Sequence, residues 1–199
     1  MDAERGSRLS TFAEQSKAYL ARLHNACEAI PLDKVELLAS ALLNAWKEKR
    51  QVFIFGNGGS AGNAIHLAND FVFGISKKFG SGLRIHALPA NTSVITCLAN
   101  DIGYESIFEY QLGLMSDPGD VVIALSGSGN SPNILKALEY SNNAGLESFA
   151  VLGFSGGKSL QLAKTPIHIP VNDMQISEDL QIIIGHMLMQ HLYSKKDLL

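Results

Sequence analysis

A glycine-rich turn in this chain lies between a run of apolar residues and a helix-forming segment that carries a histidine and a carboxylate. The apolar run VFIF is followed by Gly56, Asn57, Gly58, Gly59 and Ser60. A strand that ends in such a turn and continues as a helix exposes unpaired backbone N–H groups, and the helix dipole makes that end positive. Glycines allow close approach to the backbone, and the serine adds a hydroxyl. The turn predicts an anion site, or else a plain tight connection.

A second loop of the same kind follows the apolar run VVIAL. It reads SGSGNSP, and its hydroxyl groups belong to Ser126, Ser128 and Ser131. Pro132 suits the first turn of a helix, where its missing N–H costs nothing. Ser131 also suits the N-cap of that helix, but a cap needs one hydroxyl and the loop has three. The two loops together predict a cradle for phosphate oxygens.

Two pairs of side chains have the spacing for acid–base or metal chemistry. His66 and Asp70 are four residues apart, and Glu178 and His186 are eight apart, so each pair shares one face of a helix. If the two faces meet, two imidazoles and two carboxylates suit zinc or a similar divalent ion, or a metal-free acid–base pair. The competing interpretation is ordinary helix residues. It is preferred for the other histidines, which are His24, His86, His168 and His191.

Two further polar segments have two interpretations each. Asn91 begins the run Asn-Thr-Ser, and Asn100 and Asp101 form the next polar pair along the chain. Side chains of these types cap helices and also bind ligand hydroxyls. The physics favours capping. Asn100 and Asp101 are kept as candidate substrate ligands.

The elements that position these groups alternate between strand and helix from residue 51 onward. Strands are predicted at 52–55, 84–88, 121–125, 148–152 and 167–170, and helices at 60–73, 92–99, 104–115, 131–144, 158–163 and 177–193. This alternation is typical of an α/β fold with a parallel sheet and helices on both faces. Ligands bind such sheets beyond the carboxyl ends of the strands, where the strand order reverses.

Two helices, 8–28 and 32–49, precede the first strand. They have no strand of their own to cover, so their apolar faces need another partner. We expect a helical arm at residues 1–50 that joins a helix bundle between subunits, and one ligand-binding unit at 51–199.

Composition excludes several classes of protein. The chain has 199 residues and a net charge of −3, without a basic block for nucleic acid or an anionic membrane. No apolar run approaches the ~20 residues of a membrane span. Its two cysteines lie far apart in apolar contexts, which favours reduced thiols and a cytoplasmic location. The first loop lacks Walker A and G-x-G-x-x-G spacing, so no nucleotide cofactor is expected.

The motifs together resemble the sugar isomerase (SIS) domain family, and more closely the bacterial phosphoheptose isomerases. The resemblance covers nearly the whole chain and is carried by FGNGGSAGNAIHLA, LANDIGYESIF, GDVVIALSGSGNSPNILKAL and EDLQIIIGHMLMQ. It implies a flavodoxin-like, three-layer αβα sandwich with five parallel strands, and a homotetramer whose N-terminal helices form a central bundle and whose active sites lie between subunits.

The resemblance also implies the roles of individual residues. Phosphate would bind Asn57 and the loop serines, and one zinc ion per subunit would bind His66, Asp70, Glu178 and His186. Three positions depart from the family pattern, because Asp70 stands for a usual Glu, Glu178 for a usual Gln and Gly74 for a usual Arg. A base on the shorter Asp70 side chain would lie about 1 Å further back, and such a displacement can cost ~100-fold in rate.

The expected activity is aldose–ketose isomerisation of a sugar phosphate through an enediol. The substrate implied by the resemblance is sedoheptulose 7-phosphate, which becomes a manno-heptose 7-phosphate for a lipopolysaccharide, capsule or related glycan. Asp70 is the candidate base and His186 the candidate acid. The alternative is a non-catalytic SIS module that binds a sugar phosphate or holds a protein partner, like the replication-initiator-associating SIS proteins.

Overall fold

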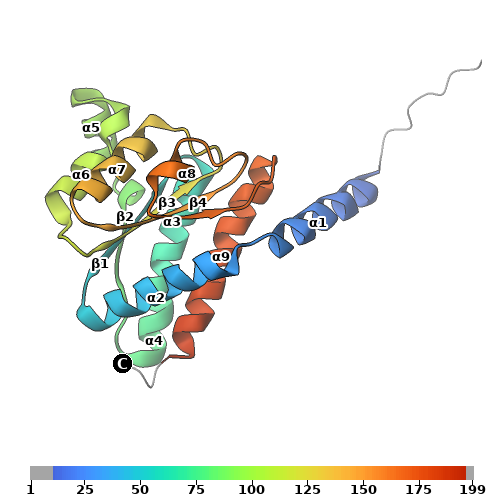
Figure 1. The fold of residues 1–199 in the computed structure, drawn as a ribbon, viewed down its shortest axis with the longest axis horizontal. Helices are drawn as coiled ribbons and strands as arrows, with labels where there is room; N and C mark the ends of the chain where they lie inside the picture. Colours follow the sequence, from blue (N-terminus) through green and yellow to red (C-terminus); the bar gives the residue numbers. More distant parts are fainter. Residues whose placement is uncertain (1–10, 196–199) are drawn as a thin grey trace, which may run out of the picture.

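Five parallel strands form the centre of the structure (Figure 1). Their order across the sheet is β2-β1-β3-β4-β5. The computed structural model describes residues 11–195. Residues 1–10 of the predicted arm, which include the start of the first predicted helix at 8–10, lie outside it, and so do residues 196–199 of the predicted ligand-binding unit. The strands are β1 (Gln51–Gly56), β2 (Arg84–Ala87), β3 (Val121–Ser126), β4 (Glu147–Leu152) and β5 (Thr165–His168).

Alternate residues of each strand supply two separate cores, because successive side chains of a strand point to opposite faces of the sheet. In β1, Val52 and Ile54 belong to one core, and Phe53 and Phe55 belong to the other. Helices cover both faces, which confirms the predicted three-layer αβα sandwich. The first face carries α2 (Leu32–Glu48), α3 (Gly59–Asn69), α4 (Ile75–Phe79) and α9 (Met174–Tyr193), and the second carries α5 (Thr92–Asp101), α6 (Glu109–Met115), α7 (Pro132–Asn143) and α8 (Ser159–Leu162).

Several predicted boundaries were wrong. The fifth strand begins at Thr165 rather than at residue 167, and it includes Pro166. Proline is tolerated there because β5 is an edge strand. The predicted helix 104–115 is a 3-10 turn, Tyr104–Ser106, followed by α6, and α9 begins three residues earlier than predicted because Asp173 caps it.

The second helix also differs from the expectation. It was predicted to have no strand to cover, yet α2 packs on the sheet, with its apolar face in the core that also receives α3 and α9. Its buried residues are Val35, Leu38, Ala39, Leu42, Ala45 and Trp46. Among the helices of residues 11–195, only α1 (Phe12–Glu28) extends from the body as an arm (Figure 1).

Polar contacts join the arm to the start of α9. The Tyr19 hydroxyl donates to Asp179, and this hydrogen bond together with burial raises the pKa of Tyr19 to about 12. Arg22 pairs with Asp173 at 3.2 Å. Phe12, at the outer end of the helix, and Leu20, beside Tyr19, are 86% and 62% exposed. The arm is therefore attached by these polar contacts and by core contacts of Ala26 and Leu23, and it keeps an uncovered apolar surface.

A glycine sets the distance between α3 and α9. A Cβ atom on Gly185 would lie 2.2 Å from Cδ2 of Leu67, which is itself buried. Any side chain at this position must push the two helices apart or displace Leu67. The approach of α3 to α9 therefore depends on glycine.

We expect Gly185→Ala to lower the free energy of unfolding by about 1–3 kcal/mol because of overpacking, even though alanine favours the helix. Gly62→Ala on α3 is the matched control, since nothing lies within 4 Å of its added Cβ. Urea unfolding followed by circular dichroism compares the two. A Gly185→Ala protein as stable as Gly62→Ala would contradict the packing argument.

Candidate active site

A cleft lies at the carboxyl ends of β1 and β3, where the strand order reverses. Its volume is about 260 Å³. Both predicted loops contribute to it, and α9 closes one side. Its lining residues are Asn57, Gly58, Gly59, Ser60, Leu125, Ser126, Gly127, Ser128, Ser131, Met174 and Glu178.

The first loop presents backbone N–H groups to the cleft. Gly58 has φ 55°, and α3 begins directly after it without a side-chain cap. The first N–H groups of a helix have no partner within the helix, so an anion in the cleft can accept from them. No lysine or arginine of residues 11–195 lines this cleft, so backbone and hydroxyl groups supply the polar contacts.

The second loop is held closed by its own serines. The Ser126 hydroxyl accepts from the N–H of Gly129 at 3.0 Å, and the Ser128 hydroxyl accepts from the N–H of Asn130 at 3.4 Å. Ser131 is the N-cap residue of α7, but its hydroxyl makes no capping hydrogen bond. The expected cap is therefore missing, and Ser131 lines the cleft instead.

Two amide networks behind the loops were not predicted. Asn57 and Asn133 exchange side-chain hydrogen bonds of 2.9 and 2.8 Å, and the Tyr104 hydroxyl donates to Asn57 at 3.0 Å. Buried Gln181 donates to the buried Ser60 hydroxyl at 3.0 Å and accepts from Asn63. The only sequence signal for these partners was the presence of amides near the motifs.

A compact group of His66, Asp70 and His186 lies where α3 faces α9. Nε2 of the two histidines are 3.3 Å apart, and each lies 3.4 Å from Oδ2 of Asp70. The histidine side chains are about half exposed, at 50% and 46%, and Asp70 is 21% exposed. We call these three residues the His–Asp–His cluster.

The cluster has the geometry of a three-residue metal site. Ligands about 2.0–2.1 Å from a tetrahedral zinc ion lie about 3.3–3.4 Å from one another, which matches the three separations in the cluster. Two imidazoles and a carboxylate are a ligand set that zinc accepts, and three protein ligands leave the fourth position open. The residues present therefore fit a divalent ion.

Glu178 lies apart from this cluster. It is outside the group of ligand atoms that converge at the cluster, and it lines the cleft instead. A Cβ on Gly59 would lie 2.3 Å from Oε1 of Glu178, so the carboxylate lies directly over the first loop. Glu178 therefore lies beside the first loop and not in the cluster.

The helix changes its winding at the cluster. A π-helical turn, Asp70–Gly74, separates α3 from α4, so the predicted helix 60–73 is longer and less regular than expected. Such turns are frequent at functional sites. A Cβ on Gly74 would lie 2.6 Å from Cε of Met189, and the Tyr193 hydroxyl donates to the Gly74 carbonyl at 2.9 Å. α9 therefore occupies the space next to Gly74.

The candidate ligands Asn100 and Asp101 lie elsewhere in this chain. They are the last residues of α5, outside the lining of the cleft. Asn100 donates to Asp101 at 2.7 Å, and the hydrogen bond from Cys97 to Asp101 raises the pKa of that thiol. Asn91 caps the start of α5 through Val94, as the sequence favoured.

The fold and the cleft are those of a phosphosugar-binding domain, and comparison with known proteins agrees. The SIS domain model matches residues 11–153. The phosphoheptose isomerase of Trichlorobacter lovleyi is 39% identical over 181 residues, 90% of each chain, and that of Aquifex aeolicus is 37% identical over 177 residues, 89% of this chain and 90% of its own. The structure of the phosphoheptose isomerase from Neisseria gonorrhoeae superposes with a TM-score of 0.84 at 26% identity, over 92% of this chain and all of that one.

The chain therefore belongs to the SIS domain family. Within that family its relatives at 32–39% identity are phosphoheptose isomerases, as the sequence motifs implied.

We expect Gln181→Leu to destabilise the protein by about 1–3 kcal/mol, because it leaves the buried Ser60 hydroxyl without its partner and removes one of the two hydrogen bonds of the half-buried Asn63 amide. Gln190→Leu is the control, since Gln190 is exposed on the same helix and its replacement should change stability by no more than about 0.5 kcal/mol. Thermal unfolding of both variants measures the difference. Equal stability of the two variants would show that the network contributes nothing.

Proposed function

We propose that this chain is a phosphoheptose isomerase, which interconverts sedoheptulose 7-phosphate and D-glycero-D-manno-heptose 7-phosphate. One observation carries the proposal. In a chain 39% identical to a phosphoheptose isomerase, the cleft between the two loops lies where α3 begins beside α9, and the His–Asp–His cluster lies further along the same two helices. A non-catalytic SIS module is not favoured, because binding a partner does not call for this cluster.

The spacing of cradle and cluster supports a long sugar phosphate. Ser60 and His66 are six residues apart on α3, which is about 9 Å along the helix. The extended carbon chain of a heptose phosphate spans such a distance, whereas a triose phosphate is too short. With its phosphate on the two loops, the substrate presents C1 and C2 to the cluster.

Proton transfer is assigned to two members of the cluster. Asp70 removes a proton from C1, beside the C2 ketone, while His186 donates a proton to the carbonyl oxygen, which gives the enediol. Return of a proton to C2 and loss of the proton on O1 then produce the aldose. Oδ2 of Asp70 faces the two imidazoles, so Oδ1, which accepts a hydrogen bond of 3.4 Å from Asn69, is the oxygen assigned to the proton of the substrate. Phosphate binding is assigned to Ser60, Ser126, Ser128 and Ser131, with Asn57 held by its amide partner.

A divalent ion, with zinc as the leading candidate, is proposed for the cluster, one per subunit. His66, Asp70 and His186 would hold it, and Glu178 would face the substrate. When bound, such an ion would polarise the carbonyl and the neighbouring hydroxyl of the substrate in place of the proton from His186, because a ligand nitrogen carries no proton to donate.

The arm supports a homotetramer as the working assembly. Phe12 and Leu20 on α1 are exposed, and so are Val72 and Phe73 beside the cluster, at 45% and 60%. Large exposed apolar groups at both places suit burial against other copies of the chain. Among residues 11–195, no helix combines the length and apolar character that crossing a bilayer requires. A cytoplasmic location remains a prediction from the cysteines.

We expect Asp70→Asn to lower kcat by about 10²–10⁴-fold, because it removes the base. Ser128→Ala should mainly raise KM. NMR of sedoheptulose 7-phosphate in D₂O measures both turnover and deuterium incorporation, and Asp117→Asn, remote from the cleft, is the control. Wild-type turnover by Asp70→Asn would overturn the assignment of the base.

We expect the zinc-loaded protein to hold one ion per subunit. His186→Ala should bind zinc at least about 100-fold more weakly, whereas His191→Ala, an exposed histidine on the same helix, should bind it normally. Mass spectrometry of the metal content and calorimetry measure this without reference to activity. Equal zinc binding by the two variants would contradict the proposed ligands.

A further inference from the structure

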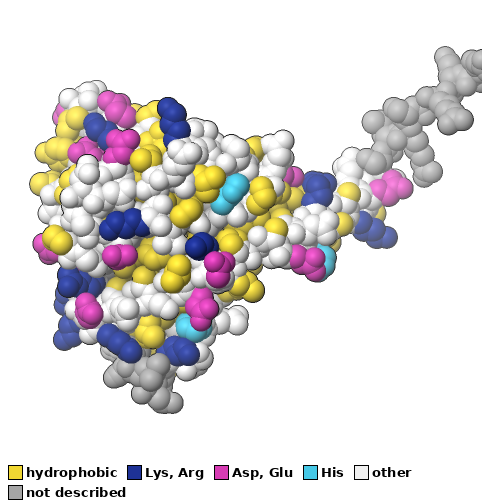
Figure 2. Space-filling view, in the orientation of Figure 1, with side chains coloured by type: hydrophobic (Ala, Val, Ile, Leu, Met, Phe, Trp, Pro, Cys, Tyr) yellow, Lys and Arg dark blue, Asp and Glu magenta, His cyan; other side chains and the backbone are white. Residues whose placement is uncertain are grey.

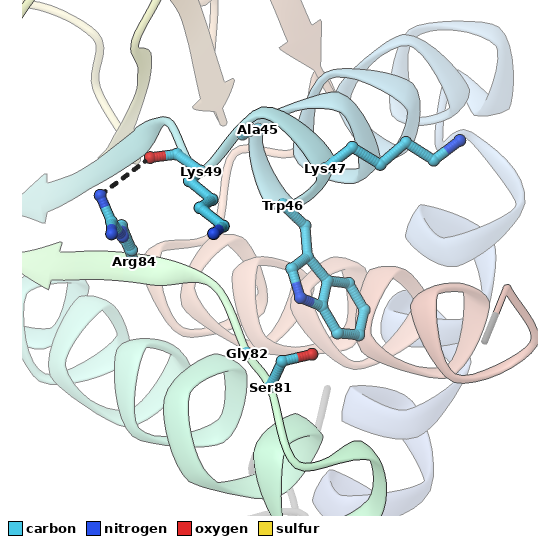
Figure 3. Close-up of a pocket in the computed structure, with 7 residues that line it drawn as sticks. All are labelled: Ala45, Trp46, Lys47, Lys49, Ser81, Gly82 and Arg84. Carbon is cyan, nitrogen blue, oxygen red and sulfur yellow. Dashed lines mark hydrogen bonds between the residues drawn. The ribbon is translucent and has the colours of Figure 1, made fainter. Parts of the chain in front are cut away.

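A second cavity lies at the amino ends of the strands, whereas the cleft lies at their carboxyl ends. It occupies about 430 Å³ where β2 begins and α2 ends, and its lining residues are Ala45, Trp46, Lys47, Lys49, Ser81, Gly82 and Arg84 (Figure 3). This volume is in the range of about 300–1,000 Å³ that small-molecule sites occupy. We call it the basic pocket. Neither the candidate mechanism nor the phosphate loops use it.

The side chains of the basic pocket are rich in hydrogen-bond donors. Trp46, Lys49, Ser81 and Arg84 each bring an N–H or O–H group, and no carboxylate lines the pocket. Arg84 uses Nη1 to donate to the Lys49 carbonyl at 3.2 Å, which leaves most of its guanidinium donors for a ligand. Glu48, the neighbouring carboxylate in the chain, pairs with Arg50 at 3.3 Å.

The two cations of the pocket form no direct ion pair in the described part of the chain, although Lys49 and Arg84 also line a neighbouring hollow with Glu48, Asp117 and Asp120. Among residues 11–195, neither Lys49 nor Arg84 has a carboxylate within ion-pair distance (4.0 Å). Figure 2 shows Lys and Arg side chains gathered at the lower left of the molecule, where Figure 1 places the end of α2. A ligand that supplies negative charge and acceptor oxygens would satisfy these groups.

Trp46 is a separate sign of a ligand. Its side chain is 7% exposed and packs against Phe79 with ring centroids 6.1 Å apart. No residue in the range 11–195 accepts a hydrogen bond from its indole N–H, and this nitrogen is not among the fully buried atoms without a partner, so it is open to water or to a ligand in the pocket. In Figure 3 the indole nitrogen points toward Gly82 and Ser81, on the side where Lys49 also points. The ammonium of Lys47 points away.

We propose that the basic pocket binds the phosphate group of a small phosphorylated metabolite. The phosphate would accept from Lys49, Arg84 and Ser81, and an oxygen of the ligand would accept from the Trp46 indole N–H. The site is distinct from the cleft, because it lies at the amino ends of the strands and the cleft lies at their carboxyl ends.

Trp46 is the single tryptophan of the chain, so its fluorescence reports on this pocket directly. The purified protein is titrated with inorganic phosphate, pyrophosphate and glucose 6-phosphate at constant ionic strength, with sodium chloride as the reference salt. We expect a saturable change in emission with the phosphates and none with chloride. Binding by glucose 6-phosphate but not by inorganic phosphate also supports the site and shows that it requires the organic part.

Two variants that each remove one positive charge distinguish a specific phosphate site from non-specific electrostatic attraction. Lys49 has φ 58°, a conformation that glycine adopts without strain, so Lys49→Gly removes the ammonium from a backbone that suits the replacement. We expect it to raise Kd by about tenfold or more, the effect of one lost charge-assisted hydrogen bond. Lys47→Ala, whose ammonium points away, should change Kd by less than about twofold.

Several results would overturn the proposal. One is the absence of a saturable response, and another is an equal loss of affinity in Lys47→Ala and Lys49→Gly. Ser128→Ala separates the two sites, because a Trp46 response lost in that variant would come from the cleft. A change in Trp46 emission that depends on protein concentration and not on phosphate concentration would show that a second copy of the chain covers the pocket.

Discussion

The parallel pairing of β1 with β3 is the constraint on which the site depends. It places Gly56 opposite Leu125, so the turns that follow the two strands leave the sheet at the same level and on neighbouring strands. β2 and β4 lie on the outer sides of this pair, so no other strand comes between the two loops. Each loop alone is a common turn in α/β proteins. Their pairing makes a shared concave surface of backbone N–H groups and hydroxyls, where a doubly charged phosphate can bind without a basic side chain from the cleft.

A second constraint acts on the same helix that the first loop begins. α3 starts at the cleft and runs along α9, and the contact between Leu67 and Gly185 lets the two helices approach closely. This approach brings His186 to His66 and Asp70 across 120 residues of sequence. The two constraints together position the proposed phosphate anchor at one end of α3 and the proposed acid–base or metal centre further along it. The distance between them is set by the rise of the helix.

The three departures from the family pattern that the resemblance implies lie in different structural settings. Asp70 remains within the cluster and begins a π-helical turn, so the shorter carboxylate coincides with a local change in backbone winding. Glu178 faces the first loop and adds a negative charge beside the anion site, where a glutamine would add none. At Gly74, Met189 and Tyr193 from α9 take the adjacent space. These positions are where substrate handling in this chain should differ from that of its relatives.

The sequence alone determined the order of strands and helices, the two loops and the face-sharing pairs on α3 and α9, because these depend on hydrophobic period, glycine position and spacing along one helix. It did not determine that α2 covers the sheet, because an amphipathic pattern does not show which surface the apolar face of the helix packs against. The hydrogen-bonding roles of the buried amides Asn133 and Gln181 could not be predicted from the sequence either, because these roles depend on the atoms that folding places beside them. Glu178 shares a helical face with His186 but lies about 12 Å from it along α9, and only the packing of α9 over the first loop assigned it to the cleft. The basic pocket likewise exists only in three dimensions, because Trp46 and Arg84 meet where α2 crosses the start of β2.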